Sequence, residues 1–190
     1  MIEGFDMANN DVRARMLAHT REVKAVPQRN GDMIDGISRE ERAEIRKVLA
    51  SGGNSIPAEK RGVCLEEDGR YLDAGIAFRD AARKLQRKDK KWCAALAERA
   101  TRNFILAGDV KEAVDACRMA ILTTRWEENL ELLKRTVGFC IDEAGKAEKT
   151  NRGLAVNMLK VALAFADPVD FDAVVRLTEK IRLLGGKLDA

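Results

Sequence analysis

Apolar residues recur every three or four positions along most of the chain, with charged residues between them, and this spacing is typical of amphipathic helices. No window shows the strict two-residue alternation, rich in Val, Ile and Thr, that predicts a strand. Short turns marked by glycine or Asp-Pro separate the periodic segments. From residue 55 onward the pattern predicts seven helices, over 56–68, 71–87, 90–107, 110–124, 127–145, 151–166 and 168–184. We therefore predict an all-α protein built of antiparallel helix pairs.

Four of the predicted boundaries carry specific signals. Gly69 and Gly108 are expected at turns, where the absence of a Cβ atom permits backbone conformations that other residues avoid. Asp167 followed by Pro168 predicts the N-cap and first residue of the last helix, and Gly185-Gly186 predicts its end.

The first 53 residues are predicted to form a helical extension ahead of a repeat domain that spans residues 54–190. Apolar positions over residues 11–26, with His19 among them, form one stripe of an amphipathic helix. Ser38 followed by Glu41 is a capping box that begins a second helix, which should end at Gly52-Gly53. We expect the amphipathic segment either to fold back into the groove of the repeat domain or to form a homodimer contact.

Two segments of the repeat domain share the same spacing of small and bulky residues. The first carries Gly69, Ala74, Phe78 and Ala81. The second carries Gly108, Ala113, Cys117 and Ala120. A third segment repeats only the later half of the pattern, with Ala155, Leu159 and Ala162. Small residues at these positions would let two helices approach closely, and Phe78 would fill the space between repeats.

These segments resemble the tetratricopeptide repeat, which carries Gly and Tyr at its turn and Ala-x3-Phe-x2-Ala in its second helix. Ala74, Ala113 and Ala155 recur after 39 and 42 residues instead of the usual 34, so the helices should be longer, similar to those of soluble NSF attachment proteins. The likeness is good over residues 56–125 and weak over 126–184. The alternative is an alanine-rich helical bundle with chance spacing.

The resemblance implies a scaffold or adaptor that binds a peptide, a helix or a subunit in a groove lined by the first helix of each pair. The partner-binding positions of the family correspond in this sequence to Glu59, Val63, Glu66, Glu98, Arg99, Arg102 and Ile105. The groove would be acidic at one end and basic at the next. Glu59 and Val63 replace the Lys and Asn that hold a carboxylate in chaperone-tail-binding members, which argues against that ligand.

The charge of the whole chain indicates little, because 34 Lys and Arg against 31 Asp and Glu give a net charge of only +3 over 190 residues. Between Arg79 and Arg102, however, nine basic residues accompany three acidic ones. A basic patch is predicted there, made of Arg83, Lys84, Arg87, Lys88, Lys90 and Lys91. Binding of nucleic acid or another polyanion is therefore the alternative function. It is the less favoured one, because Trp92 is the only aromatic residue nearby.

The sequence favours no enzymatic function and predicts no catalytic residue, because it lacks the usual phosphate-binding, zinc-protease and nucleophile motifs. His19 is the single histidine, and the four cysteines are more than twenty residues apart, so we expect neither a metal site nor a cofactor. The cysteines are interpreted as reduced core residues. No long apolar run and no secretory signal are found, and we expect a cytoplasmic protein.

Overall fold

A computed structural model describes residues 36–51 and 56–187 of the chain. Within these residues every regular element is a helix, which confirms the predicted all-α class. The helices belong to one compact unit that spans Ile37–Ala190. They are α3 (Arg39–Ala50), α4 (Ala58–Glu67), α5 (Tyr71–Leu85), α6 (Lys90–Ala107), α7 (Val110–Thr123), α8 (Trp126–Ala147), α9 (Arg152–Ala166) and α10 (Phe171–Leu183). The amphipathic segment predicted over 11–26 lies outside the described residues.

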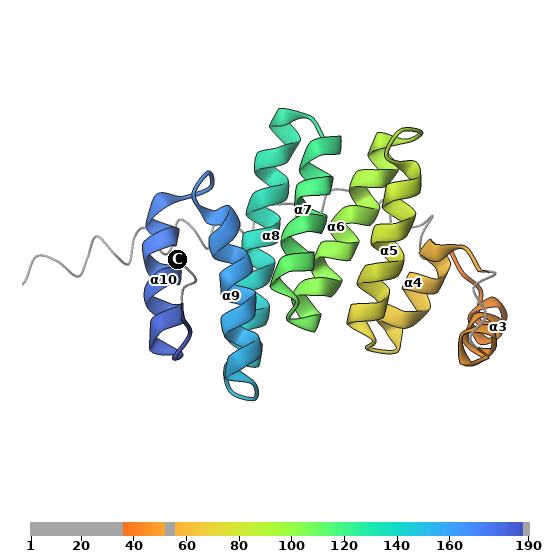
Figure 1. The fold of residues 1–190 in the computed structure, drawn as a ribbon, viewed down its shortest axis with the longest axis horizontal. Helices are drawn as coiled ribbons and strands as arrows, with labels where there is room; N and C mark the ends of the chain where they lie inside the picture. The colour runs from red at the N-terminus through yellow and green to blue at the C-terminus, as the bar shows by residue number, and fades with distance from the viewer. Residues whose placement is uncertain (1–35, 52–55, 188–190) are drawn as a thin grey trace, which may run out of the picture. The chain divides into compact units, whose positions relative to one another are not determined.

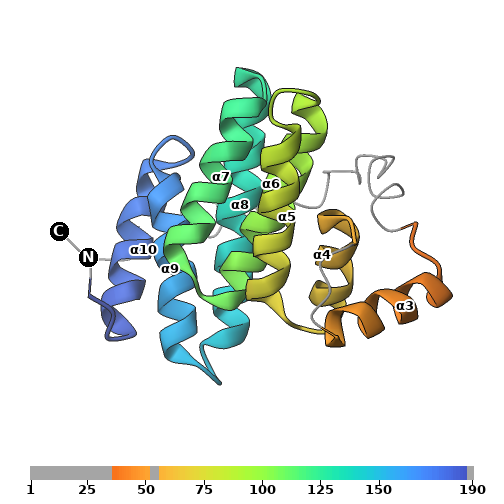
Figure 2. The ribbon, with the colours of Figure 1, turned by 45° about the vertical axis from the view of Figure 1, so that its right-hand side comes forward.

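The helices follow one another side by side in chain order, as Figure 1 shows. The closest neighbours are α4 with α5, α5 with α6, α6 with α7, and α8 with α9, while α10 packs on α9. Helices two apart also touch, since α6 contacts α8 and α7 contacts α9. The first helices of the pairs, α4, α6 and α8, thus form one layer, and the second helices, α5, α7 and α9, form another (Figure 2). This arrangement confirms the predicted helix pairs.

Glycines on α4 and α5 make room for two buried phenylalanine rings. A Cβ atom added to Gly62 would lie 2.8 Å from the ring of Phe78, and one added to Gly75 would lie 2.8 Å from the ring of Phe104. Both rings are fully buried, and so are the four alanines predicted at helix contacts, Ala74, Ala81, Ala113 and Ala120. The small residues therefore let each helix lie close to a ring of the next one along the chain.

The turns between paired helices use glycine as predicted. Gly69 follows α4 with φ of 71° and Gly108 follows α6 with φ of 76°. Both values lie in the left-handed region, where an L side chain is strained. Gly185, with φ of 80°, likewise follows the end of α10.

The predicted start of the last helix at Asp167-Pro168 is wrong. Residues 167–169 form a turn that closes on the end of α9, because the carbonyl of Ala166 accepts hydrogen bonds from the N–H groups of Val169 and Asp170, both at 2.9 Å. Asp170 is the N-cap of α10, and its carboxylate accepts a hydrogen bond from the N–H of Asp172 at 3.0 Å. Pro168 lies within this turn and outside both helices, so its lack of an N–H group costs no helical hydrogen bond.

The helix predicted after Ser38 is α3, and Ser38 caps it by accepting a hydrogen bond from the N–H of Glu41 at 3.1 Å. The carboxylate of Glu41 instead pairs with Lys60 on α4, 2.6 Å away. The compact unit starts at Ile37 and includes α3, whereas the sequence pattern put a domain boundary after residue 53.

Candidate partner-binding face

All seven residues predicted to line the groove lie on α4 or α6, which are first helices of their pairs. Two of them, Val63 and Ile105, are buried in the core and offer no side-chain surface to a partner. Arg102 is exposed. The remaining four are half-buried, namely Glu59, Glu66, Glu98 and Arg99.

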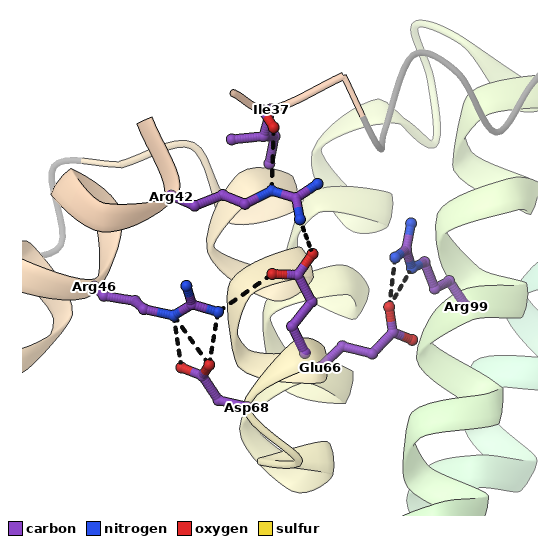
Figure 3. A network of polar contacts seen from close by, with 7 residues as sticks. Ile37, Arg42, Arg46, Glu66, Asp68 and Arg99 are labelled. Atoms are coloured by element: carbon purple, nitrogen blue, oxygen red, sulfur yellow. Dashed lines mark hydrogen bonds and ion pairs between the residues drawn. The ribbon is translucent and has the colours of Figure 1, made fainter. Parts of the chain in front are cut away.

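Glu66 and Arg99 bridge α4 and α6 (Figure 3). One carboxylate oxygen of Glu66 accepts a hydrogen bond from Nε of Arg99 at 2.8 Å, and the other accepts one from the amide of Asn103 at 2.7 Å. The Arg99 guanidinium also lies over the ring of Phe78, 4.8 Å from its centroid. These contacts join two successive repeats and cover the buried ring, so Glu66 and Arg99 stabilise the fold.

Two carboxylates that follow Glu66, at the C-terminal end of α4, are paired with arginines of α3. Arg42 pairs with Glu67 at 2.5 Å, and Arg46 donates a hydrogen bond to Asp68 at 3.0 Å (Figure 3). Carboxylates at the C-terminal end of a helix are disfavoured by the helix dipole. The arginines of α3 offset this cost, and they occupy the carboxylates that a basic partner would bind.

Charged and aromatic side chains meet where α6 lies against α8. The carboxylate of Glu98 binds Arg102 on its own helix at 3.0 Å and Arg135 on α8 at 3.2 Å. The Arg102 guanidinium lies 5.7 Å from the centroid of the half-buried Phe139 ring. The side chains of Arg102 and Arg135 are 49% and 53% exposed. We call these four residues the α6–α8 face.

Sequence reasoning identified Glu98 and Arg102 but missed Arg135 and Phe139, because the repeat pattern is weak after residue 125. It also missed the ion pair between Arg79 on α5 and Glu112 on α7, which links the second helices of two repeats. A signal was present in the spacing of opposite charges. Arg79 and Glu112 are 33 residues apart, as are Glu66 and Arg99, and Glu98 and Arg135 are 37 apart.

All six residues of the predicted basic patch are exposed around the turn between α5 and α6. Among the described residues, none of the six has an ion-pair partner. The carboxylate of Asp89, the only acidic residue in this run, accepts a hydrogen bond from the N–H of Trp92 at 2.9 Å. Lys90 and Lys91 begin α6, whose first turn has no acidic residue. Positive charges at the N-terminal end of a helix are disfavoured by the helix dipole, so the charges of Lys90 and Lys91 do not stabilise α6.

The four cysteines are free and buried, as predicted for core residues. Burial raises the pKa of Cys117 on α7 to about 11, and it also raises the pKa of Cys140 on α8. Both thiols are therefore protonated, and poor nucleophiles, near neutral pH.

In the part of the chain that the structure describes, no cluster of three or more His, Cys, Asp or Glu residues could hold a metal ion. None of the described helices combines the length and the apolar composition that a membrane crossing requires. Comparison with protein-family models, with curated proteins and with solved structures gave no significant match to this chain.

Proposed function

We propose that this chain is a protein-binding scaffold of tetratricopeptide-like helix pairs, whose partner docks on the α6–α8 face. The observation that carries this proposal is the stacking of the exposed Arg102 on the half-buried Phe139. Arginine and aromatic residues are enriched in the centres of protein interfaces, where a partner removes them from water. Glu98 and Arg135 flank this pair and fix its place between two helices.

The partner is a helix or an extended peptide that bears a carboxylate. Two arginines share the single carboxylate of Glu98, so the face has an excess of positive charge. The ring of Phe139 would supply apolar contact, while the guanidinium groups would orient the acidic side chain of the partner. The buried free thiols suit a reducing compartment, and we place this scaffold in the cytoplasm.

The variants that test this proposal follow from the contacts of each arginine. Reversing Arg99 to Glu would place a second negative charge beside Glu66 and uncover Phe78, so it would damage the fold. Arg102 and Arg135 are exposed, and reversing them changes the surface with little effect on the core. Arg118 on α7, which is 68% exposed, provides a matched control away from the α6–α8 face.

The test is a pull-down from nuclease-treated lysate of the source cell, with retained proteins identified by mass spectrometry. A protein held by the wild type and by Arg118→Glu, but lost from the double variant Arg102→Glu, Arg135→Glu, supports the proposal. Circular dichroism must show that both variants are folded. If the double variant retains the same proteins as the control, the partner does not use this face.

A second candidate function is the binding of a polyanion, such as nucleic acid, at the basic patch. It is favoured by six exposed cations without ion-pair partners among the described residues, two of them at a helix start that disfavours them. The affinity for an oligonucleotide should fall steeply with salt and be lost when Lys84, Arg87, Lys88, Lys90 and Lys91 are neutralised. Binding that depends little on salt would contradict this candidate.

A further inference from the structure

We propose that the exposed face of α8 is a homodimer contact, in which α8 helices of two copies pack antiparallel with Gly138 at the two-fold axis. This interface lies beside the α6–α8 face, whose α8 residues Arg135 and Phe139 contact side chains of α6. The proposal is tested on the purified protein alone, so its success or failure is independent of the proposed partner.

The exposed side of α8 carries two apolar side chains and two glycines. Leu130 and Ile141 are 41% and 39% exposed, and they lie eleven residues apart, which is three helical turns. A Cβ atom added to Gly138 or Gly145 would meet nothing within 4 Å. Exposed apolar side chains and glycines on one helix side would let a second helix approach closely.

Charged residues on the same side are arranged for an antiparallel neighbour. With Gly138 opposite its own copy, Lys134 faces Asp142 of the second copy, and the symmetry makes this pair twice. Glu127 faces Lys149, which lies in the turn just after α8. Among the described residues Glu127, Asp142 and Lys149 have no ion-pair partner, and Lys134 binds only the exposed Glu131 of its own helix. The second copy would thus supply the missing opposite charges.

A parallel arrangement is excluded by the same residues. It would place Lys134 beside Lys134, Asp142 beside Asp142 and Glu127 beside Glu127, and like charges at an interface are repulsive. The charge pattern therefore selects the antiparallel direction.

The apolar residues of both copies lie along one edge of the antiparallel pair. With a rise of about 1.5 Å per residue, Leu130 lies about 12 Å to one side of Gly138, and Ile141 lies about 4.5 Å to the other side. In this register Leu130 faces Lys146 of the other copy, and Ile141 faces Arg135. Two-fold symmetry keeps Leu130 and Ile141 on the same edge of the contact, where Leu130 of one copy lies about 7.5 Å along the helix axis from Ile141 of the other.

Cysteine cross-linking tests the register. Gly138→Cys and Gly145→Cys both place a side chain in open space, and the four native cysteines are buried. Under mild oxidation the full chain with Gly138→Cys should form a disulfide-linked dimer, because the two thiols meet at the axis. The chain with Gly145→Cys should stay monomeric on a non-reducing gel, since its two thiols would be about 20 Å apart. Equal cross-linking of both variants, or of neither, would overturn the proposal.

Charge reversal tests the same contact without new cysteines. In sedimentation velocity, the wild-type chain should dimerise with rising concentration. Lys134→Glu and Asp142→Lys should each weaken the dimer about tenfold, and the two changes together should restore it, because each new pair is again of opposite charge. A wild-type chain that stays monomeric, or single variants that dimerise as the wild type does, would show that α8 is not the interface.

Discussion

The helices α4 to α7 and the helices α8 to α10 use glycine in different ways. In the first group Gly62 and Gly75 lie directly against the rings of Phe78 and Phe104, and the neighbouring helices are close. In the second group a Cβ atom added to Gly138 or Gly145 would meet nothing within 4 Å, although α8 packs closely on α9. Glycine destabilises a helix interior relative to alanine, so the presence of glycine at each of these positions requires an explanation. In the first group the explanation is the close packing of a ring on the glycine. In the second group we propose that it is the approach of a second copy in the dimer.

The largest effect is expected from removing a ring in the first group. Phe104 is fully buried against Gly75 and beneath Arg79. Phe104→Ala should lower the free energy of unfolding by about 3–5 kcal/mol, since it deletes buried apolar surface and leaves a cavity. Urea unfolding followed by circular dichroism measures this change. Leu130→Ala, at an exposed site of α8, is the control and should change stability by less than about 0.5 kcal/mol in the monomer.

Two glycine-to-alanine substitutions should have opposite signs. Gly75→Ala puts a methyl group 2.8 Å from the Phe104 ring and should destabilise the fold by about 1–3 kcal/mol. Gly138→Ala meets no neighbour and should stabilise it by about 0.5–1 kcal/mol, because alanine favours the helix. Thermal unfolding at a low protein concentration compares the two. If both variants lose stability equally, the contrast between the two groups of helices is not one of packing.

The sequence predicts the first group of helices better than the second for a physical reason. Residues such as Ala74, Phe78 and Ala113 have strict size requirements where helices touch, and such requirements produce a repeat that can be read without a structure. Exposed helix faces impose no such requirement, so Arg135 and Phe139 left no pattern to recognise. The same limit explains the start of α10, where the choice between Asp167 and Asp170 as N-cap depends on hydrogen bonds to the end of α9.

Charged groove residues could be located by spacing, but their partners could not. Placing Glu66 and Arg99 on first helices needs only the repeat, whereas their ion pair depends on how the helices are staggered. The ion pairs of Glu67 and Asp68 with the arginines of α3 could not be predicted from the sequence either, because they join segments on either side of residues 52–55. Charges that appear available in the sequence are therefore partly used within the fold.

The junction between the two groups of helices should weaken in alkaline solution. Cys117 and Cys140 face each other's helices there, and burial raises the pKa of both, that of Cys117 from 9.0 to about 11. In the unfolded chain the thiol loses its proton first, so stability is complete below pH 9 and falls as the pH rises toward 11, by up to about 1.4 kcal/mol per pH unit for each thiol. Urea unfolding between pH 8 and 10.5 measures the slope. Cys117→Ala should make it shallower, and an unchanged slope would contradict this assignment.

The smallest effect is expected at the helix starts, where the two groups again differ. The first turn of α6 holds Lys90 and Lys91, whereas that of α8 holds Glu127 and Glu128. Lys90→Glu with Lys91→Glu should raise stability by about 0.3–1 kcal/mol at low salt, because negative charge suits this end of the helix dipole. Glu127→Lys with Glu128→Lys should lower it by a similar amount, and salt should diminish both changes. Thermal unfolding at two ionic strengths measures them. If the α6 variant is less stable than the wild type, these lysines stabilise the fold, and the argument that they are kept for an anionic ligand fails.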